Sequence, residues 1–578
     1  MSALGLIAKL TTAALIAQSE MPAPPPAPPT SPDAQETETT VAEPEKAPAA
    51  WQNNQWVLLK PELNLFELDG YFRLRPRMLR NLNFGLGEAI AYDSLPPDLQ
   101  RYTATDGGNA DVSSTDIRLR LEPTIHVSRN VEVVATFDVF DNYSLGSSAA
   151  TNNGNIILDD GTVESQDAIH VKRAYASLRA LNEQLEVTLG RVPNHFGLGM
   201  LFNSGDCLSC DYGHTADRLS FGLNMLDHLF VASYDWVASG PTLSNDYPGR
   251  LGFDAFPWDD VDQWSIKALR MDSEELIEDH VAQGKSVFNY GGWFIYRTQA
   301  RGTAESGSFD NADADALAEE VATGSTAQER RDGRLYVVDA FAKYYSGLLT
   351  VGVEGAFIGG TFSDTIGGVD APDTVGIQQF GLAAEINYGL ESRERGAQLN
   401  LKVGGASGDS WPGMGTFADS EEQRGLQQST QTWDDSIDNF QFSPDYHLDL
   451  LLFRRILGRV SDAWYVRPSM TYLFDNDFEL GVASIYSQSF FNRSTPRCWA
   501  ANGESSCSSD RPGNKGLGLE FDGQIAYQAK KRGVDGGIRL ELNGGVLIPL
   551  GGFDMSTVSE TYETSIAWTL EAQIGLLF

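Results

Sequence analysis

Apolar and polar residues alternate along most of the chain after Trp56, in segments of roughly 9 to 15 residues, the length that a tilted membrane-spanning strand needs. In the last segment one face carries Trp568, Leu570, Ala572, Ile574, Leu576 and Phe578, and the other carries Thr569, Glu571, Gln573 and Gly575. Successive side chains of a strand point to opposite faces, so this pattern predicts a strand that is apolar on one side and polar on the other. The same period of two recurs at 538–543 and 399–404.

Further segments of this kind follow one another along the chain. Candidate strands begin near Leu68, Ser113, Val131, His170, Glu183, Asp217, His228, Lys285, Arg334, Gly347, Val375, Ala397, His447, Asp462, Phe478, Lys515, Asp535 and Thr561. Two are ambiguous, because 217–225 is short and 448–457 is apolar nearly throughout and also fits a helix. We therefore expect about 16 strands, within a range of roughly 14 to 18. Residues 262–271 and 312–321 interrupt the alternation and are predicted to form helices in loops.

Composition distinguishes a membrane barrel from a soluble sheet, which also alternates. The 578 residues include 57 Gly, 29 Phe and 20 Tyr, yet the mean hydropathy is only -0.26. No run approaches the ~18 apolar residues of a transmembrane helix. Short polar connections alternate with long ones, as in barrels with short turns at one end and long loops at the other. The predicted fold class is all-β, a transmembrane antiparallel β-barrel with long loops on one side.

The first residues predict targeting and tail segments that precede the barrel. Lys9 stands before the apolar stretch 10–17, which indicates a secretory signal peptide over 1–20. Residues 21–50 contain nine prolines and five acidic side chains, a composition that cannot bury a core. We expect a disordered, Pro-rich, acidic tail over 21–55, located in the periplasm, and a barrel over 56–578.

The net charge of -37 argues against nucleic acid as a partner, because phosphate binding needs a basic surface. Four cysteines occur as two close pairs, Cys207 with Cys210 and Cys498 with Cys507, which predicts disulfides in an oxidising compartment. A zinc site is the alternative for the first pair, with His214 and His195 as further ligands. The disulfide is favoured, and no metal or other cofactor is expected.

Charged residues on the polar faces of strands are candidates for the barrel lumen. Arg73, Arg75 and Arg77 alternate with apolar residues in the first strand, and a charged side chain facing the lipid midplane costs about 2 to 4 kcal/mol. The complete set of predicted lumen-facing residues is Arg73, Arg75, Arg77, Arg118, Arg120, Glu122, Arg173, Arg179, Lys402, Arg539 and Glu541. The arginines either pair with acidic loop residues or form a ladder that favours anionic permeants.

Three local features resemble known outer-membrane proteins. The terminal Phe578 on an aromatic, alternating strand resembles the signature by which outer-membrane barrels are recognised for assembly. Residues 189–202 (LGRVPNHFGLGMLF) resemble a turn of porin-type channels and of barrels related to alginate export. Residues 444–474 are similar to a signature of uncharacterised outer-membrane proteins of myxobacteria and related lineages. These resemblances imply a Gram-negative outer membrane and assembly through the C-terminal strand.

The leading functional prediction is a channel that passes small hydrophilic solutes, with anions as one expected class, and that carries out no chemistry. A plugged structural or docking barrel is the first alternative. The second is an outer-membrane hydrolase, although none of the seven histidines lies in a serine-hydrolase motif. The expected partners are outer-membrane lipid, the solutes and the assembly machinery, and the pattern does not predict an oligomeric state.

Overall fold

A computed structural model describes residues 65–86, 111–145, 169–238, 261–303, 328–363, 374–392, 395–409, 436–491, 515–530, 537–556, 561–562 and 564–578. Among these residues, eighteen antiparallel strands form one closed barrel. The strands are β1(Phe66–Arg80), β2(Val112–Ser128), β3(Val131–Ser144), β4(Ile169–Ala180), β5(Leu185–Pro193), β6(Thr215–Met225), β7(His228–Ala238), β8(Val261–Arg270), β9(Val287–Thr303), β10(Gln328–Ser346), β11(Leu349–Ser363), β12(Thr374–Gly389), β13(Gly396–Ala406), β15(Ala463–Leu473), β16(Phe478–Ser489), β17(Gly516–Lys530), β18(Gly537–Pro549) and β21(Ala567–Leu577).

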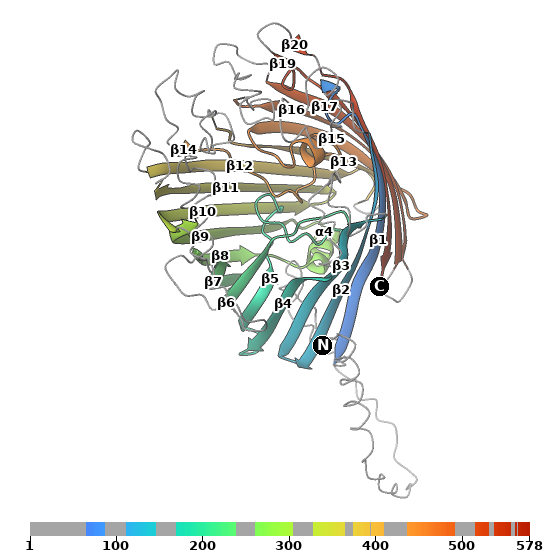
Figure 1. Cartoon of the computed structure of the whole chain (residues 1–578). Helices are drawn as coiled ribbons and strands as arrows, with labels where there is room; N and C mark the ends of the chain where they lie inside the picture. The colour runs from blue at the N-terminus through green and yellow to red at the C-terminus, as the bar shows by residue number, and fades with distance from the viewer. Residues whose placement is uncertain are drawn as a thin grey trace, which may run out of the picture. The chain divides into compact units, whose positions relative to one another are not determined.

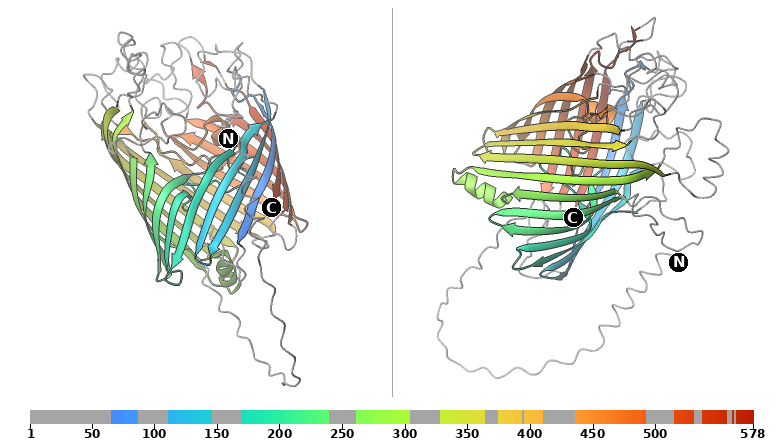
Figure 2. Two further views of the ribbon diagram at one scale, coloured as in Figure 1. Left: turned by 60° about the horizontal axis from the view of Figure 1, so that its bottom comes forward. Right: turned by 90° about the vertical axis from the view of Figure 1, so that its left-hand side faces the viewer.

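Each strand pairs with its neighbours in chain order, and the first strand closes the ring. β1 pairs with β2 on one side and with β21 on the other (Figure 1). The further views show the strands as one continuous tilted wall (Figure 2). Outside the ring, β14(Ser436–Ile437) pairs in parallel with β12, and β19(Met555–Ser556) pairs with β20(Thr561–Tyr562). The predicted fold class is therefore confirmed.

Three sequence predictions need correction. The expected count of about 16 strands is lower than the eighteen observed, although the predicted range includes that number. The helix predicted over 262–271 is wrong, because β8 occupies this segment. The strand predicted near His447 is also wrong, since 438–462 contains the short π-helix η4(Leu452–Ile456) instead. The ambiguous segment 217–225 lies within β6.

Several predictions fall outside the described residues. These are the signal peptide over 1–20, the tail over 21–55, the helix over 312–321, and Cys498 with Cys507. Within the described residues the helix α4(Glu274–Ala282) lies between β8 and β9, with Ser273 as its N-cap. No described helix has the length and apolar character needed to cross a membrane.

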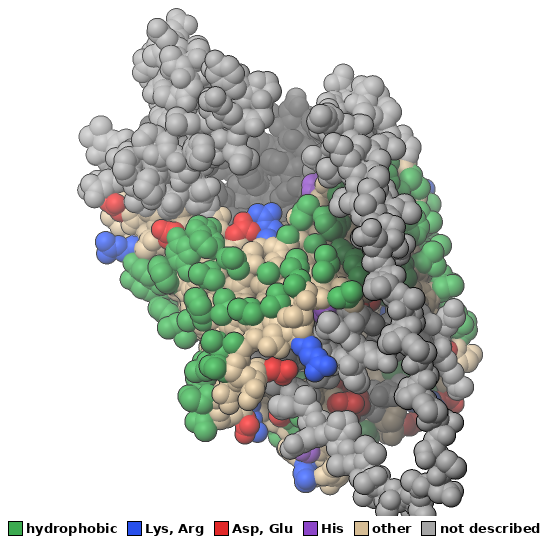
Figure 3. Space-filling view, turned by 90° about the horizontal axis from the view of Figure 1, so that it is seen from below, with side chains coloured by type: hydrophobic (Ala, Val, Ile, Leu, Met, Phe, Trp, Pro, Cys, Tyr) green, Lys and Arg blue, Asp and Glu red, His purple; other side chains and the backbone are tan. Residues whose placement is uncertain are grey.

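The outward strand faces are apolar. In β18 the side chains of Ile538, Leu540, Leu542 and Val546 are exposed, whereas their polar neighbours along the strand face inward. Hydrophobic side chains cover much of the described surface in the space-filling view (Figure 3). Exposed apolar side chains in such numbers are unfavourable in water, so the outer surface suits a lipid environment.

Short turns define one end of the barrel, which we call the short-turn end. Examples are the connections from Ser128 to Val131, from Ser346 to Leu349 and from Leu473 to Phe478. Strands β5 and β13 both end at the opposite rim, and two later segments, one directly after β5 and one directly after β14, lie inside the barrel. We call 194–214 the first inward segment and 438–462 the second inward segment.

Candidate channel interior

A cluster of arginines covers the inner wall formed by β1, β2 and β4. Arg73 on β1 lies directly opposite Arg118 on β2, and both side chains are completely buried. Arg75, Arg77, Arg120 and Arg173 are also buried. The predicted arginines of β1 and β2 therefore lie side by side on adjacent strands, and Arg173 lies on β4, with β3 in between.

Acidic side chains of the same wall compensate this positive charge. Asp116 accepts from Arg73 at 3.2 Å and from Arg75 at 3.1 Å. Asp138 on β3 binds Arg120 with N–O distances of 2.7 and 2.8 Å. Both aspartates occupy inward positions of their strands. The alternation of polar and apolar residues indicates these positions, but the predicted lumen residues did not include them.

Several other guanidinium N–H groups bind the first inward segment. Arg73 donates to the carbonyl of Leu208 at 2.9 Å, and Arg118 donates to the carbonyl of Cys210 at 2.7 Å. Further bonds run from Arg120 to Gly205 at 3.2 Å and from Arg173 to Ser204 at 2.6 Å. The arginines thus fix the backbone of residues 204–210 against the wall.

Asp211 adds a charged contact to this attachment. Its carboxylate forms two hydrogen bonds of 2.9 Å with the guanidinium of Arg75. Burial by itself raises the pKa of Asp211, but Arg75, Arg73 and Arg118 outweigh that effect and hold the pKa well below its usual value. The carboxylate therefore stays ionised and paired.

The opposite wall binds the start of the same segment. Glu354 on β11 is fully buried, and its carboxylate accepts from the backbone N–H groups of Leu198, Met200 and Leu201. Apolar contacts accompany these bonds, because the ring of Phe196 packs on Trp293 and Phe341 at centroid distances of 5.5 and 5.0 Å. The first inward segment therefore spans the lumen between two walls.

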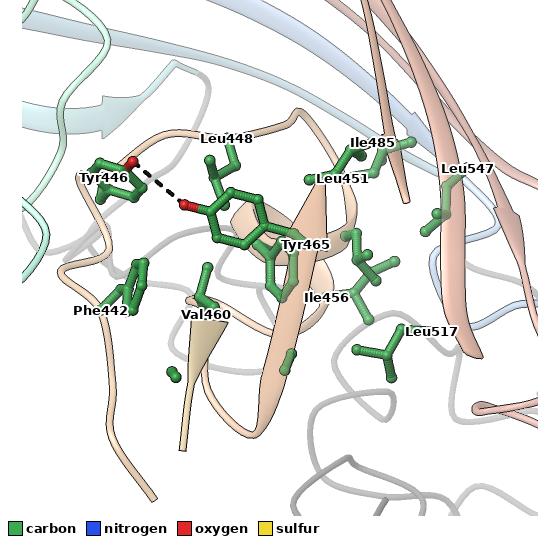
Figure 4. Packing of buried hydrophobic residues seen from close by; sticks show 14 of the residues in the cluster. Phe442, Tyr446, Leu448, Leu451, Ile456, Val460, Tyr465, Ile485, Leu517 and Leu547 are labelled. Carbon is green, nitrogen blue, oxygen red and sulfur yellow. Dashed lines mark hydrogen bonds between the residues drawn. The ribbon is translucent and has the colours of Figure 1, made fainter. Parts of the chain in front are cut away.

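The second inward segment is attached to β17 and β21. Glu520 accepts from the N–H groups of Leu450, Leu451 and Leu452 at 2.8 to 2.9 Å. Arg455 pairs with Glu571 at 2.8 Å. Around η4 an apolar cluster packs against the inside of the barrel, and Tyr465 donates a hydrogen bond to Tyr446 within it (Figure 4).

The two inward segments also bind each other. Asp445 accepts from the N–H groups of Asp211 at 3.0 Å and Gly213 at 2.6 Å. Arg454 donates to the carbonyl of Ser209 at 2.9 Å. A carboxylate that accepts two or more N–H groups is a strong anchor for a loop. Together the segments form a charge-stabilised constriction across the barrel.

A polar cavity of about 470 Å³ lies beside this constriction. Its wall includes Asn387 and Asn400 of β12 and β13, close to the short-turn end of those strands. The lining residues with charged side chains or imidazole are Glu385, Lys402, His447, Asp449, Arg454, Arg467, Asp522, Glu541 and Glu571.

Most charges around the cavity are paired. Lys402 binds Glu385 at 2.9 Å, and the neighbouring Arg539 pairs with Glu541. By contrast, the hydrogen bonds of Arg454 and Arg467 that organise this wall go to neutral oxygens, the carbonyl of Ser209 and the hydroxyl of Ser469. Both guanidiniums are positively charged, and carboxylates of the same cavity act on them, Glu571 on Arg454 and both Asp449 and Asp522 on Arg467.

The remaining lumen candidates lie at the margins of these networks. Glu122 is partly buried, 4.0 Å from Arg173, and Arg179 binds Glu132 at 2.9 Å. Cys207 and Cys210 form a disulfide within the first inward segment.

The sequence reasoning missed the residues that hold the inward segments. Glu354 stands at an inward position of a strand whose neighbouring inward residues are small, which is the signal that could have identified it. Glu520 is one of several polar inward residues of β17, so the sequence does not distinguish it. Asp445 gives no such signal, because its partners lie more than 230 residues away in the chain.

Comparison with known proteins gave matches among solved structures only. No family model and no curated protein matches the chain. The chain is similar to OpdK of Pseudomonas aeruginosa with vanillate, with 10% identity, a TM-score of 0.43 and coverage of 89% of this chain and 98% of that one. OccK2 (OpdF) of the same organism with glucuronate has 9% identity, a TM-score of 0.41 and the same coverage. A BenF-like porin of Pseudomonas fluorescens has 9% identity, a TM-score of 0.43 and coverage of 89% and 99%.

These matches add no argument for the fold, because their identities and TM-scores are low. The fold assignment rests on the strand pairing within the chain itself. The resemblances to alginate-export barrels and to the myxobacterial proteins stay predictions. In the structure, residues 189–202 and 444–474 both contribute to the inward segments and the strands that flank them.

Proposed function

We propose that this chain is a channel of the bacterial outer membrane through which small hydrophilic solutes, anions included, diffuse. The observation that carries the proposal is a polar cavity of about 470 Å³ inside a barrel whose outer strand faces are apolar. This arrangement places a membrane barrel in lipid and leaves its interior to water and solutes. With the short-turn end in the periplasm, the tail over 21–55 would lie on the same side.

Anion preference in this proposal comes from the cavity and not from the arginine ladder. Arg73, Arg75 and Arg118 are fully buried and are compensated by aspartates and carbonyls, so they support the constriction. Arg454 and Arg467 line the cavity and donate hydrogen bonds to neutral oxygens, while neighbouring carboxylates offset part of their charge. Fixed positive charges in a narrow lumen favour anionic permeants.

A plugged structural barrel is the second candidate, and a specific observation favours it. The inward segments are held by buried carboxylates on both walls and by Asp445 between them, which is more anchoring than an open pore requires. A hydrolase would need a nucleophile in hydrogen-bonding contact with a base. The described contacts that organise this interior are mainly ion pairs and bonds to backbone groups, so they lend no support to the enzymatic alternative.

Single-channel recording in planar bilayers under a salt gradient tests the proposal. We expect stable conductance steps and a reversal potential that indicates anion preference. In Arg467→Gln the anion-to-cation permeability ratio should fall about two- to fivefold, because a nearby charge contributes up to ~1 kcal/mol in water-filled surroundings. Arg395→Gln is the matched control, since Arg395 is exposed at a short turn.

The outcomes separate the two candidates. A folded protein that gives no conductance steps would establish the plugged barrel and remove the channel. Conductance with an unchanged reversal potential in Arg467→Gln would retain the channel and reject the assignment of selectivity to this side chain.

A further inference from the structure

The disulfide of the first inward segment lies next to a histidine of the second. The ligand atoms of Cys207, Cys210 and His447 all lie within 4.8 Å of one another. Cys210 is buried, whereas Cys207 is more accessible. His447 comes from a segment more than 230 residues further along the chain, so only the fold brings the three side chains together.

His447 also has access to the cavity. Its side chain is partly exposed and lines the cavity together with Ser209. The nearest acidic group to its Nε2 is Asp445 at 3.9 Å, too far for a hydrogen bond. The histidines considered from the sequence are differently placed, since Nδ1 of His214 accepts from the N–H of Asn203, and Nδ1 of His195 accepts from the N–H of Ser204.

We propose that Cys207, Cys210 and His447 form a binding site for a thiophilic transition-metal ion such as Zn²⁺ once the disulfide is reduced. The site joins the two inward segments where Asp445 and Arg454 already connect them. It is independent of whether the barrel conducts, because it requires only the folded constriction.

Reduction is a thiol–disulfide exchange with an external dithiol. A thiolate of the dithiol attacks the accessible Sγ of Cys207, a mixed disulfide forms, and the Cys207–Cys210 bond breaks to release the Cys210 thiolate. The second thiol of the reagent then attacks the mixed disulfide and releases Cys207. The reagent leaves as its own disulfide, so two electrons pass from it to the protein and both cysteines become available as thiols.

The geometry of a tetrahedral ion fits this cluster. With Zn–S bonds of about 2.3 Å and a Zn–N bond of about 2.1 Å, the ligand atoms stand roughly 3.5 to 3.8 Å apart. The Sγ atoms of Cys207 and Cys210 and a ring nitrogen of His447 reach these distances when the sulfur–sulfur bond opens and the His447 ring moves slightly. Three protein ligands leave the fourth position to water from the cavity, as in open zinc sites.

The test uses the full chain in detergent, in a Cys498→Ser/Cys507→Ser background that removes the other thiols. The protein is reduced with dithiothreitol, separated from it under nitrogen and titrated with Co²⁺, which reports thiolate ligation through a charge-transfer band. Resistance to unheated SDS shows that the barrel stays folded. We expect one Co²⁺ per chain in the reduced protein and no band in the oxidised protein, and competition by Zn²⁺ should abolish the band.

Variants separate this site from adventitious binding. His447→Ala should weaken Co²⁺ binding at least about tenfold, the scale on which metal sites respond to loss of a supporting group. Cys207→Ser should abolish the two-thiolate band, and His214→Ala is the matched control that should bind as the parent does. Absence of the band in folded, reduced protein, or equal affinity in His447→Ala and the parent, would overturn the proposal. Loss of the folded barrel on reduction would overturn it as well.

Discussion

Arg73, Arg75 and Arg118 bring three positive charges into the interior with no exposure to solvent. Such charges are costly unless they are paired and hydrogen-bonded. Here aspartates of the wall supply part of the compensation, and Asp211 with the carbonyls of 208 and 210 supplies more, although Nε of Arg73 has no hydrogen-bond partner among the described residues. The ladder and the first inward segment therefore depend on each other.

Asp211→Asn removes one negative charge from this network. We expect a loss of about 3 to 5 kcal/mol in the free energy of unfolding, because a buried guanidinium loses its ionic partner. Urea titration in detergent, followed by tryptophan fluorescence, measures the change. Asp217→Asn is the control, since Asp217 forms an exposed pair with Arg191 and should cost no more than about 1 kcal/mol. Equal losses in both variants would contradict the role of Asp211.

The depressed pKa of Asp211 gives this loss a defined pH dependence. A carboxylate whose pKa is lowered by folding contributes stability that is complete above its unfolded pKa of about 3.9 and is lost as the pH falls through the folded pKa. The stability difference between the parent and Asp211→Asn should therefore stay constant from neutral pH down to about pH 5, and should shrink only below about pH 4. A difference that already disappears near pH 6 would show that Asp211 is not held by the arginines.

The predicted set of lumen residues and the observed networks agree in part. Alternation identifies which face of β1 and β2 is polar. That face must point inward, because even one lipid-facing charge is costly. It cannot identify the partner of each charge, since partners such as Asp211 and Glu571 come from distant segments. For the same reason, the sequence left open whether the arginines are paired or free.

At the scale of elements, the inward segments are the least predictable part of the fold. The apolar stretch 448–457 looks like a buried strand or helix because it packs in a core inside the lumen. β8 was mistaken for a helix because Leu269, on its inward face, packs against the cluster around Phe196 and breaks the polar phase of the strand. In both segments some side chains that face the barrel interior are apolar instead of polar, so polar and apolar residues no longer alternate regularly along the sequence.

Asp445 connects the two inward segments by accepting hydrogen bonds from the N–H groups of Asp211 and Gly213. In Asp445→Ala we expect the segments to separate more readily, with a cost of about 1 to 3 kcal/mol for the unsatisfied N–H groups. Single-channel recording should show larger or more frequent fluctuations in conductance. Asp475→Ala, at an exposed short turn, should behave as the parent does. Identical traces for Asp445→Ala and the parent would mean that the segments are held without Asp445.

At the scale of the whole molecule, the barrel depends on an apolar outer surface. Leu542 lies near the middle of β18 and faces outward, so Leu542→Arg should destabilise the folded barrel in lipid vesicles by about 2 to 4 kcal/mol. Gln524→Arg, on the cavity side of the adjacent β17, should cost much less because water reaches it. Unfolding by urea in vesicles measures both variants, and the reverse order would contradict the assigned faces.

The pairing of β1 with β21 also determines when the barrel can be completed. These strands stand at opposite ends of the described chain, so the pairing that closes the ring has the longest sequence separation among the described strand pairs. Contacts between distant residues form slowly, because the chain loses the entropy of a very large loop before it gains any interaction. We therefore expect closure to be a late and slow step of folding, and an unclosed intermediate would expose two strand edges that can pair with other chains.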